Sequence, residues 1–203
     1  DFNNREHVNY FTHFSRRSAY HIYHIPLGMT KREITAILPV NEPGYMHSFG
    51  MTQKYVVLAE YPFVVNPFKL LLSGKPFIEN FVWKPEQGTR FIVIERTTGK
   101  LIGSYVTKAF FAFHHINAFE DGDTIIIDIS SYPDTSIINS LYLDVLRGIV
   151  NKPIVSAGEF RRYRISLGDS AVNHEIISKD VIELPRINYA HKNTKPYRFA
   201  YGV

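Results

Sequence analysis

Apolar and polar residues alternate with a period of two along most of the chain, a pattern typical of β-strands with one buried face. Runs rich in Gly, Asn, Asp and Pro separate the alternating segments and indicate turns. Two pairs of segments are expected to form hairpins, because they flank the turns at 97–100 and 120–123. The expected strands are 20–25, 34–40, 54–61, 90–95, 101–107, 110–119, 124–130 and 159–167.

Two segments carry a helical spacing instead. Residues 137–149 have apolar side chains at intervals of three and four, which predicts one helix, and residues 67–73 predict one or two helical turns. Short strands joined by frequent turns favour a sandwich, a barrel or a propeller. The sequence has no repeat, linker or domain boundary, so residues 1–203 are expected to belong to one all-β domain.

Composition narrows the possible functions. The chain has no Cys, which excludes disulfides, thiolate metal sites and a Cys nucleophile, and fits a cytoplasmic protein. The net charge is +4, but the basic residues are scattered, so no nucleic-acid partner is expected. No apolar run approaches the roughly 18 residues of a membrane span. The 15 Phe and 13 Tyr indicate either a β-rich core or an apolar pocket for a long flat ligand.

Histidines are the first candidates for chemistry, because imidazole binds iron, copper, zinc and nickel. Of the nine, His47 follows a turn and precedes an apolar strand. His114 and His115 lie inside the expected strand 110–119, where they would face opposite sides. Periodicity alone leaves open a metal role and a core His bonded to a backbone carbonyl. The common nucleophile, zinc-protease, phosphate and dinucleotide motifs do not occur.

Four motifs then resemble one family, the carotenoid cleavage oxygenases. The segment YMHSFGMT at 45–52 resembles the family's HSFG(L/M)T motif, and FHHINAFED at 113–121 resembles its FHHIN motif with the ED that follows. ELPRIN at 183–188 and KPYRFAYG at 195–202 match two further motifs in the same order. The resemblance covers nearly the whole chain, and four co-linear motifs are far more specific than any one alone.

The resemblance implies a seven-bladed β-propeller with short helical insertions, which holds one Fe(II) on its axis through four His. Position by position, His47 corresponds to the second iron ligand, His114 to the third, and His115 to a neighbour that is not a ligand. Glu183 corresponds to a carboxylate that accepts a hydrogen bond from a ligand His and so orients its ring.

Family members are more than twice as long as this chain, and their first and fourth ligands correspond to positions outside it. We therefore expect residues 1–203 to be the incomplete central portion of one propeller domain, as a proteolytic piece or one chain of a nicked enzyme. The remaining segments or chains would complete the site, and the chain alone would not bind iron tightly.

The implied reaction uses Fe(II), with O2 as co-substrate, to cleave a conjugated C=C bond of a carotenoid or apocarotenoid into aldehyde or ketone products. The resemblance leaves open a stilbene-cleaving oxygenase or, more distantly, a retinoid isomerase. A non-catalytic carotenoid-binding propeller and an inert fragment are alternatives of another class. Candidates for an apolar substrate tunnel, each with plain core packing as its alternative, are Phe49, Phe63, Trp83 and Phe113.

The segment 66–77 is short, apolar and flanked by lysines, which suits shallow insertion into a membrane but not a span. In the family this region lies near the tunnel mouth and contributes to a membrane-facing patch. We therefore expect a cytoplasmic protein with a peripheral membrane contact; a helix packed on a neighbouring blade is the alternative. The candidate patch residues are Phe68, Leu70, Leu71 and Leu72.

Overall fold

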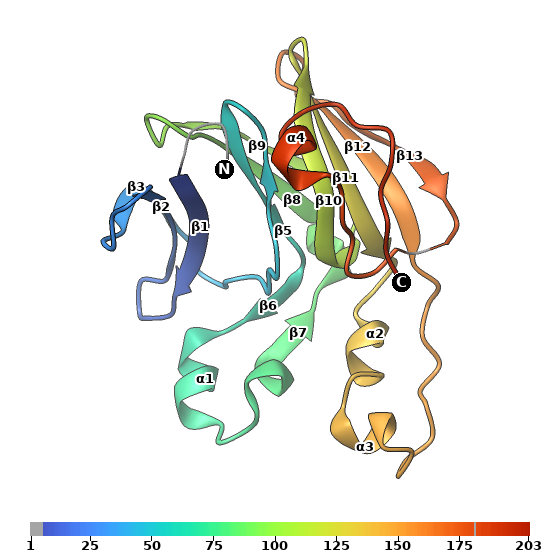
Figure 1. Ribbon diagram of the computed structural model, residues 1–203. Coiled ribbons are helices and arrows are strands. Elements are labelled where there is room, and N and C mark those ends of the chain that lie inside the picture. The colour runs from blue at the N-terminus through green and yellow to red at the C-terminus, as the bar shows by residue number, and fades with distance from the viewer. Residues whose placement is uncertain (1–5, 181) are drawn as a thin grey trace.

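The computed structural model describes residues 6–180 and 182–203, whose strands form four antiparallel sheets (Figure 1). The first sheet contains, in spatial order, β1 (Glu6–His13), β2 (Ala19–Pro26) and β3 (Glu33–Pro39). The second contains β4 (Gly50–Met51), β5 (Tyr55–Glu60), β8 (Thr89–Glu95) and β9 (Leu101–Thr107). The third contains β10 (Phe111–Asp121), β11 (Thr124–Tyr132), β12 (Glu159–Ser166) and β13 (Val172–Ser178). A small fourth sheet pairs β6 (Phe63–Val65) with β7 (Phe81–Trp83).

Short helices fill the connections. Helix α1 (Pro67–Leu72) and the 3-10 turn η1 (Phe77–Asn80) join β6 to β7, and the 3-10 turn η2 (Pro85–Gln87) leads into β8. Helices α2 (Ser136–Asn139) and α3 (Leu143–Leu146) lie between β11 and β12, and α4 (Tyr189–Lys192) follows β13. Helices α1, α2 and α3 project from one end of the sheets, and α4 lies toward the other (Figure 1). No described helix combines the length and apolarity that a membrane span requires.

The second sheet is buried on both faces, which explains its continuous apolar runs. Along β5, Val57 and Ala59 join one core cluster, whereas Val56 and Leu58 join another. The first cluster continues into residues of the third sheet, and the second into residues of the first sheet. The three sheets therefore stack face to face like successive propeller blades.

The innermost strands of the second and third sheets pack against each other. Strand β4 packs against β10, and a Cβ on Gly50 would lie 3.4 Å from the Cβ of Ala118. This close approach brings the segment before β4 next to the middle of β10, which positions the candidate site described below.

All eight strands expected from the sequence are confirmed, as are both hairpins. The expected single helix at 137–149 is wrong: α2 and α3 are separated by Tyr142 in an extended conformation. Ile137 and Ile138 pack against the core, but Leu143 and Leu146 are exposed, so no continuous surface buries the apolar stripe. Strands that alternation did not predict are β1, β4, β6, β7 and β13.

Candidate metal centre

The rings of His47 and His114 lie beside each other. His47 belongs to the irregular segment that precedes β4, and His114 to the middle of β10. Their ring centroids are 5.3 Å apart and the ring planes are nearly perpendicular, at 88°. The Phe113 ring packs edge-on against His47 at 5.7 Å, which covers one side of the pair with apolar surface.

The pairing of β10 with β11 is interrupted at His114. Ala112 pairs with Ser131 and His115 with Ile129, so two residues of β10 oppose the single Ser130 of β11. Such a bulge re-aims side chains and interrupts strict alternation. As expected from the sequence, His114 and His115 turn to different partners: His114 contacts His47 and Glu183, and His115 contacts Ser48.

Glu183 is hydrogen-bonded to the His114 ring. One carboxylate oxygen accepts a hydrogen bond from His114 Nδ1 at 2.5 Å, and the other accepts one from the Tyr132 hydroxyl at 2.7 Å. Burial, together with this bond to Glu183, raises the pKa of Tyr132, so its hydroxyl remains a donor. With Nδ1 committed to Glu183, His114 has Nε2 left for another partner.

Glu183 reaches this position from a loop that closes on itself. Its backbone N–H donates to the Val203 carbonyl at 2.9 Å, and the Val203 N–H donates back at 3.0 Å. The Asn117 side chain, on β10, donates to the carbonyls of Lys192 and Lys195 at 3.0 Å each. The loop 183–203 is thus fastened to the same strand that carries His114.

The electrostatics favour a neutral imidazole at His47. Burial lowers its pKa, His114 lowers it further, and Glu183 opposes both effects. Neutral imidazole is the form that binds metals. The Nε2 atom of His115 is shielded from solvent, and burial, with a smaller contribution from His114, lowers the pKa of His115 to about 3.

The His47–His114 pair fits a shared metal ion. A first-row metal about 2.1 Å from one nitrogen of each ring lies about 3.2 Å from each centroid, which at a tetrahedral angle separates the centroids by about 5.2 Å. The observed 5.3 Å is close to this value. Across residues 6–180 and 182–203, no group of three or more His, Cys, Asp or Glu side chains is arranged to hold a metal ion.

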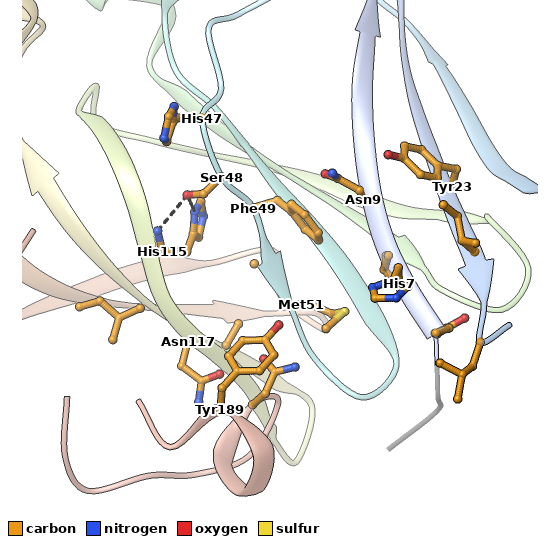
Figure 2. A pocket seen from close by; sticks show the side chains of 18 residues that line it. His7, Asn9, Tyr23, His47, Ser48, Phe49, Met51, His115, Asn117 and Tyr189 are labelled. Atoms are coloured by element: carbon orange, nitrogen blue, oxygen red, sulfur yellow. Dashed lines mark hydrogen bonds between the residues drawn. The ribbon is translucent and has the colours of Figure 1, made fainter. Parts of the chain in front are cut away.

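A cavity of about 930 Å³ extends from His47 along β4 toward α4 (Figure 2). Its walls come from β1 and β2, from residues 47–51, from β10 and from the region of α4. Phe49 and Met51 supply apolar wall, and Tyr23 faces them from β2. The cavity therefore offers a space with apolar and polar walls that has His47, but not His114, in its lining.

The other candidate tunnel residues occupy different places. Phe63 is buried in the main core, and Trp83 and Phe113 pack against that core, Phe113 also contacting His47. Of the four tunnel candidates, Phe49 lines the cavity and the other three do not. In the segment 66–77, Phe68, Leu71 and Leu72 are exposed, but Leu70, expected in the same patch, packs against the core instead.

The comparisons with known proteins decide the family. The family model RPE65, described as retinal pigment epithelial membrane protein, matches residues 1–203. The chain belongs to this family. The resemblance to carotenoid cleavage oxygenases is thereby confirmed.

Curated relatives of this RPE65-family chain are named as carotenoid dioxygenases or isomerooxygenases. The mitochondrial carotenoid-cleaving dioxygenase of Macaca fascicularis is 35% identical over 213 residues, covering 83% of the chain and 38% of the relative. The carotenoid isomerooxygenase of Galleria mellonella is 29% identical over 170 residues, covering 79% and 33%. The β,β-carotene 15,15'-dioxygenase of Rattus norvegicus is 29% identical over 193 residues, covering 79% and 34%. The RPE65-family chain thus spans less than two fifths of each relative.

Solved structures confirm the fold. A variant of the Synechocystis apocarotenoid oxygenase matches 96% of the RPE65-family chain and 40% of its own chain, with a TM-score of 0.78 and 20% identity. A cobalt-substituted form of the same oxygenase gives a TM-score of 0.77 at 20% identity, covering 95% and 39%. The chain is therefore part of a β-propeller with short helical insertions; the seven-blade count stays a prediction.

Ser48 and Tyr132 contact His115 and Glu183, and neither is among the site residues predicted from the sequence. Ser48 lies inside the HSFG motif, so its position was a usable signal. Tyr132 follows the expected strand 124–130 as an ordinary apolar residue, and nothing in its surroundings distinguishes it.

Proposed function

We propose that the complete protein is an Fe(II)-dependent dioxygenase that cleaves a conjugated C=C bond of a carotenoid or apocarotenoid to aldehyde or ketone products. The pairing of His47 with His114, with Glu183 on the far nitrogen of His114, carries the proposal. The names of the relatives, which include carotenoid-cleaving and β,β-carotene dioxygenases, support the substrate class.

His47 and His114 would hold the iron through neutral imidazole nitrogens, and other parts of the protein would supply the remaining ligands. Bound iron would supply the activation of O2 that the cleavage of a conjugated double bond requires. Glu183 keeps the proton on His114 Nδ1, which leaves Nε2 free to bind and raises the basicity of the ring.

The surroundings of the pair suit an apolar, elongated substrate. Phe113 lies against the His47 ring, and Phe49 lines the cavity that starts there. These side chains would exclude water from the reacting bond and restrict the orientation of a flat polyene. No acid, base or nucleophile of the chain is needed to form a covalent intermediate.

Incubation of the complete protein with Fe(II), O2 and a panel of carotenoids, apocarotenoids and stilbenes, followed by mass spectrometry of the products, tests the proposal. Aldehyde or ketone fragments from a carotenoid or apocarotenoid are expected, and a His47→Ala variant should form none. Cleavage of stilbenes alone would support the stilbene-oxygenase alternative. Tight carotenoid binding without products would support a non-catalytic binding protein.

We further propose that α1 contacts the surface of a membrane, from which an insoluble polyene could enter. Phe68, Leu71 and Leu72 are 57%, 82% and 80% exposed, and the lysines at 69 and 75 could lie near lipid headgroups. The segment of α2 and α3 projects from the same end of the sheets (Figure 1). It adds the exposed side chains of Leu141, Leu143, Leu146, Ile149, Val150 and Ile154.

A further inference from the structure

Ser48 links the segment that carries His47 to strand β10, which carries His114. Its hydroxyl donates a hydrogen bond to the Phe113 carbonyl at 2.7 Å and accepts one from the His115 backbone N–H at 2.9 Å. The same oxygen lies 2.8 Å from His115 Nδ1 (Figure 2). One side chain therefore meets three polar atoms of the β10 bulge.

A single hydroxyl proton determines how these bonds are arranged. Because that proton goes to the Phe113 carbonyl, the contact with His115 Nδ1 must be donated by the ring. His115 is then the tautomer protonated at Nδ1, and its shielded Nε2, which has no hydrogen-bond partner among residues 6–180 and 182–203, carries no proton. Ser48 acts like a backbone peptide group from a neighbouring strand, donating to one residue of the β10 edge and accepting from another.

The hydrogen bonds of Ser48 join residues that are adjacent in sequence to His47 and His114. Ser48 is the residue after His47, and its two backbone partners, Phe113 and His115, are the residues on either side of His114. We propose that Ser48 is a positioning residue that fixes the separation and mutual angle of the His47 and His114 rings, and so the geometry of the metal site. The inference rests on the proposed function in one respect, that these two rings share a metal.

The test uses Co(II) bound to the iron-free complete protein, because its visible absorption reports the ligand geometry without any turnover. Ser48→Ala removes the link and should weaken Co(II) binding about 10–100-fold, the range typical of groups that orient metal ligands, and should change the absorption bands. Ser48→Thr keeps the hydroxyl and should restore both. The matched control is Ser18→Ala, because the Ser18 hydroxyl likewise donates to the Ser15 carbonyl and accepts from a Ser15 N–H, but in the β1–β2 hairpin.

The outcomes distinguish a failure of the proposed function from a failure of the role of Ser48. Wild-type protein that binds no Co(II) overturns the proposed function, and the role of Ser48 with it. Wild-type protein that binds Co(II), with unchanged affinity and bands in Ser48→Ala, overturns only the role of Ser48. Equal spectral changes in Ser18→Ala would do the same, since they would reflect general destabilisation. If Ser48→Ala does not fold, 15N NMR of the His115 ring in the wild-type protein decides: protonation at Nε2 overturns the inference, and protonation at Nδ1 supports it.

Discussion

Replacing Glu183 with Gln isolates the effect of its negative charge on the candidate metal centre. The substitution keeps the size and shape of the side chain but makes it neutral. It retains one oxygen acceptor and puts an amide donor where the second oxygen was. Glu183 accepts hydrogen bonds from His114 Nδ1 on one oxygen and from the Tyr132 and Ser130 hydroxyls on the other, so the Gln amide keeps an acceptor on one side only.

The magnitude follows from the loss of the negative charge. A hydrogen bond to a charged group contributes about 1.5–3 kcal/mol and a neutral one about 0.5–1.5 kcal/mol, so a bond that survives in neutral form loses about 1–1.5 kcal/mol. The side chains of His114 and Glu183 are 24% and 23% exposed, so solvent reduces this value. A net loss of about 1.4–2.7 kcal/mol corresponds to metal binding that is about 10–100-fold weaker.

Metal affinity can be measured by competition with a chelator, using the complete protein and Fe(II) without oxygen. The matched control is Glu175→Gln, which makes the same chemical change in an exposed ion pair with Arg164 on the third sheet. Glu175→Gln should leave the affinity unchanged. Full iron occupancy and wild-type affinity in Glu183→Gln would refute the role assigned to Glu183.

Three further expectations follow. His47→Ala should reduce the number of imidazole nitrogens that pulsed EPR detects at the metal, and His115→Gln should not; a lower count in His115→Gln would contradict the ligand assignment. Changing Leu71 and Leu72 together to Ser should weaken binding to liposomes about tenfold or more, because a buried Leu contributes about 1.5–3 kcal/mol; unchanged binding in a sedimentation assay would exclude α1 as the contact. Arg162→Met should lower the free energy of unfolding in urea by about 3–5 kcal/mol, because it leaves the fully buried Asp128 carboxylate bonded to the neutral Tyr197 hydroxyl but without a cation; a loss below about 1 kcal/mol would contradict this.

Alternation predicted eight of the described strands and missed β4 and β13 for identifiable reasons. Strand β13 has the sequence VNHEIIS and is largely exposed, so no apolar face marks it. Strand β4 has only two residues, too few for any period to be read. The helix expected at 137–149 failed because a spacing of apolar residues does not reveal whether a surface exists to bury them.

Less of the candidate site than of the fold could be predicted from periodicity. Periodicity placed His114 and His115 on opposite faces but could not foresee the bulge, because a bulge depends on the pairing partner and not on the strand alone. Likewise, no local pattern brings Glu183 to His114 across 69 positions. The motif resemblance anticipated that pair, but it could not indicate the three contacts of Ser48.

The closed loop 183–203 has a consequence for heat inactivation. Its ends are joined by four backbone hydrogen bonds, and its middle is held by Asn117 and Asp128, so it can open without breaking a single pair of blade strands. Local openings of this kind have lower free energies than global unfolding. On warming, Glu183 would leave His114 while the sheets remain intact. The temperature of inactivation would therefore lie below the temperature of global unfolding. The loss of activity would then depend on the time spent at the lower temperature.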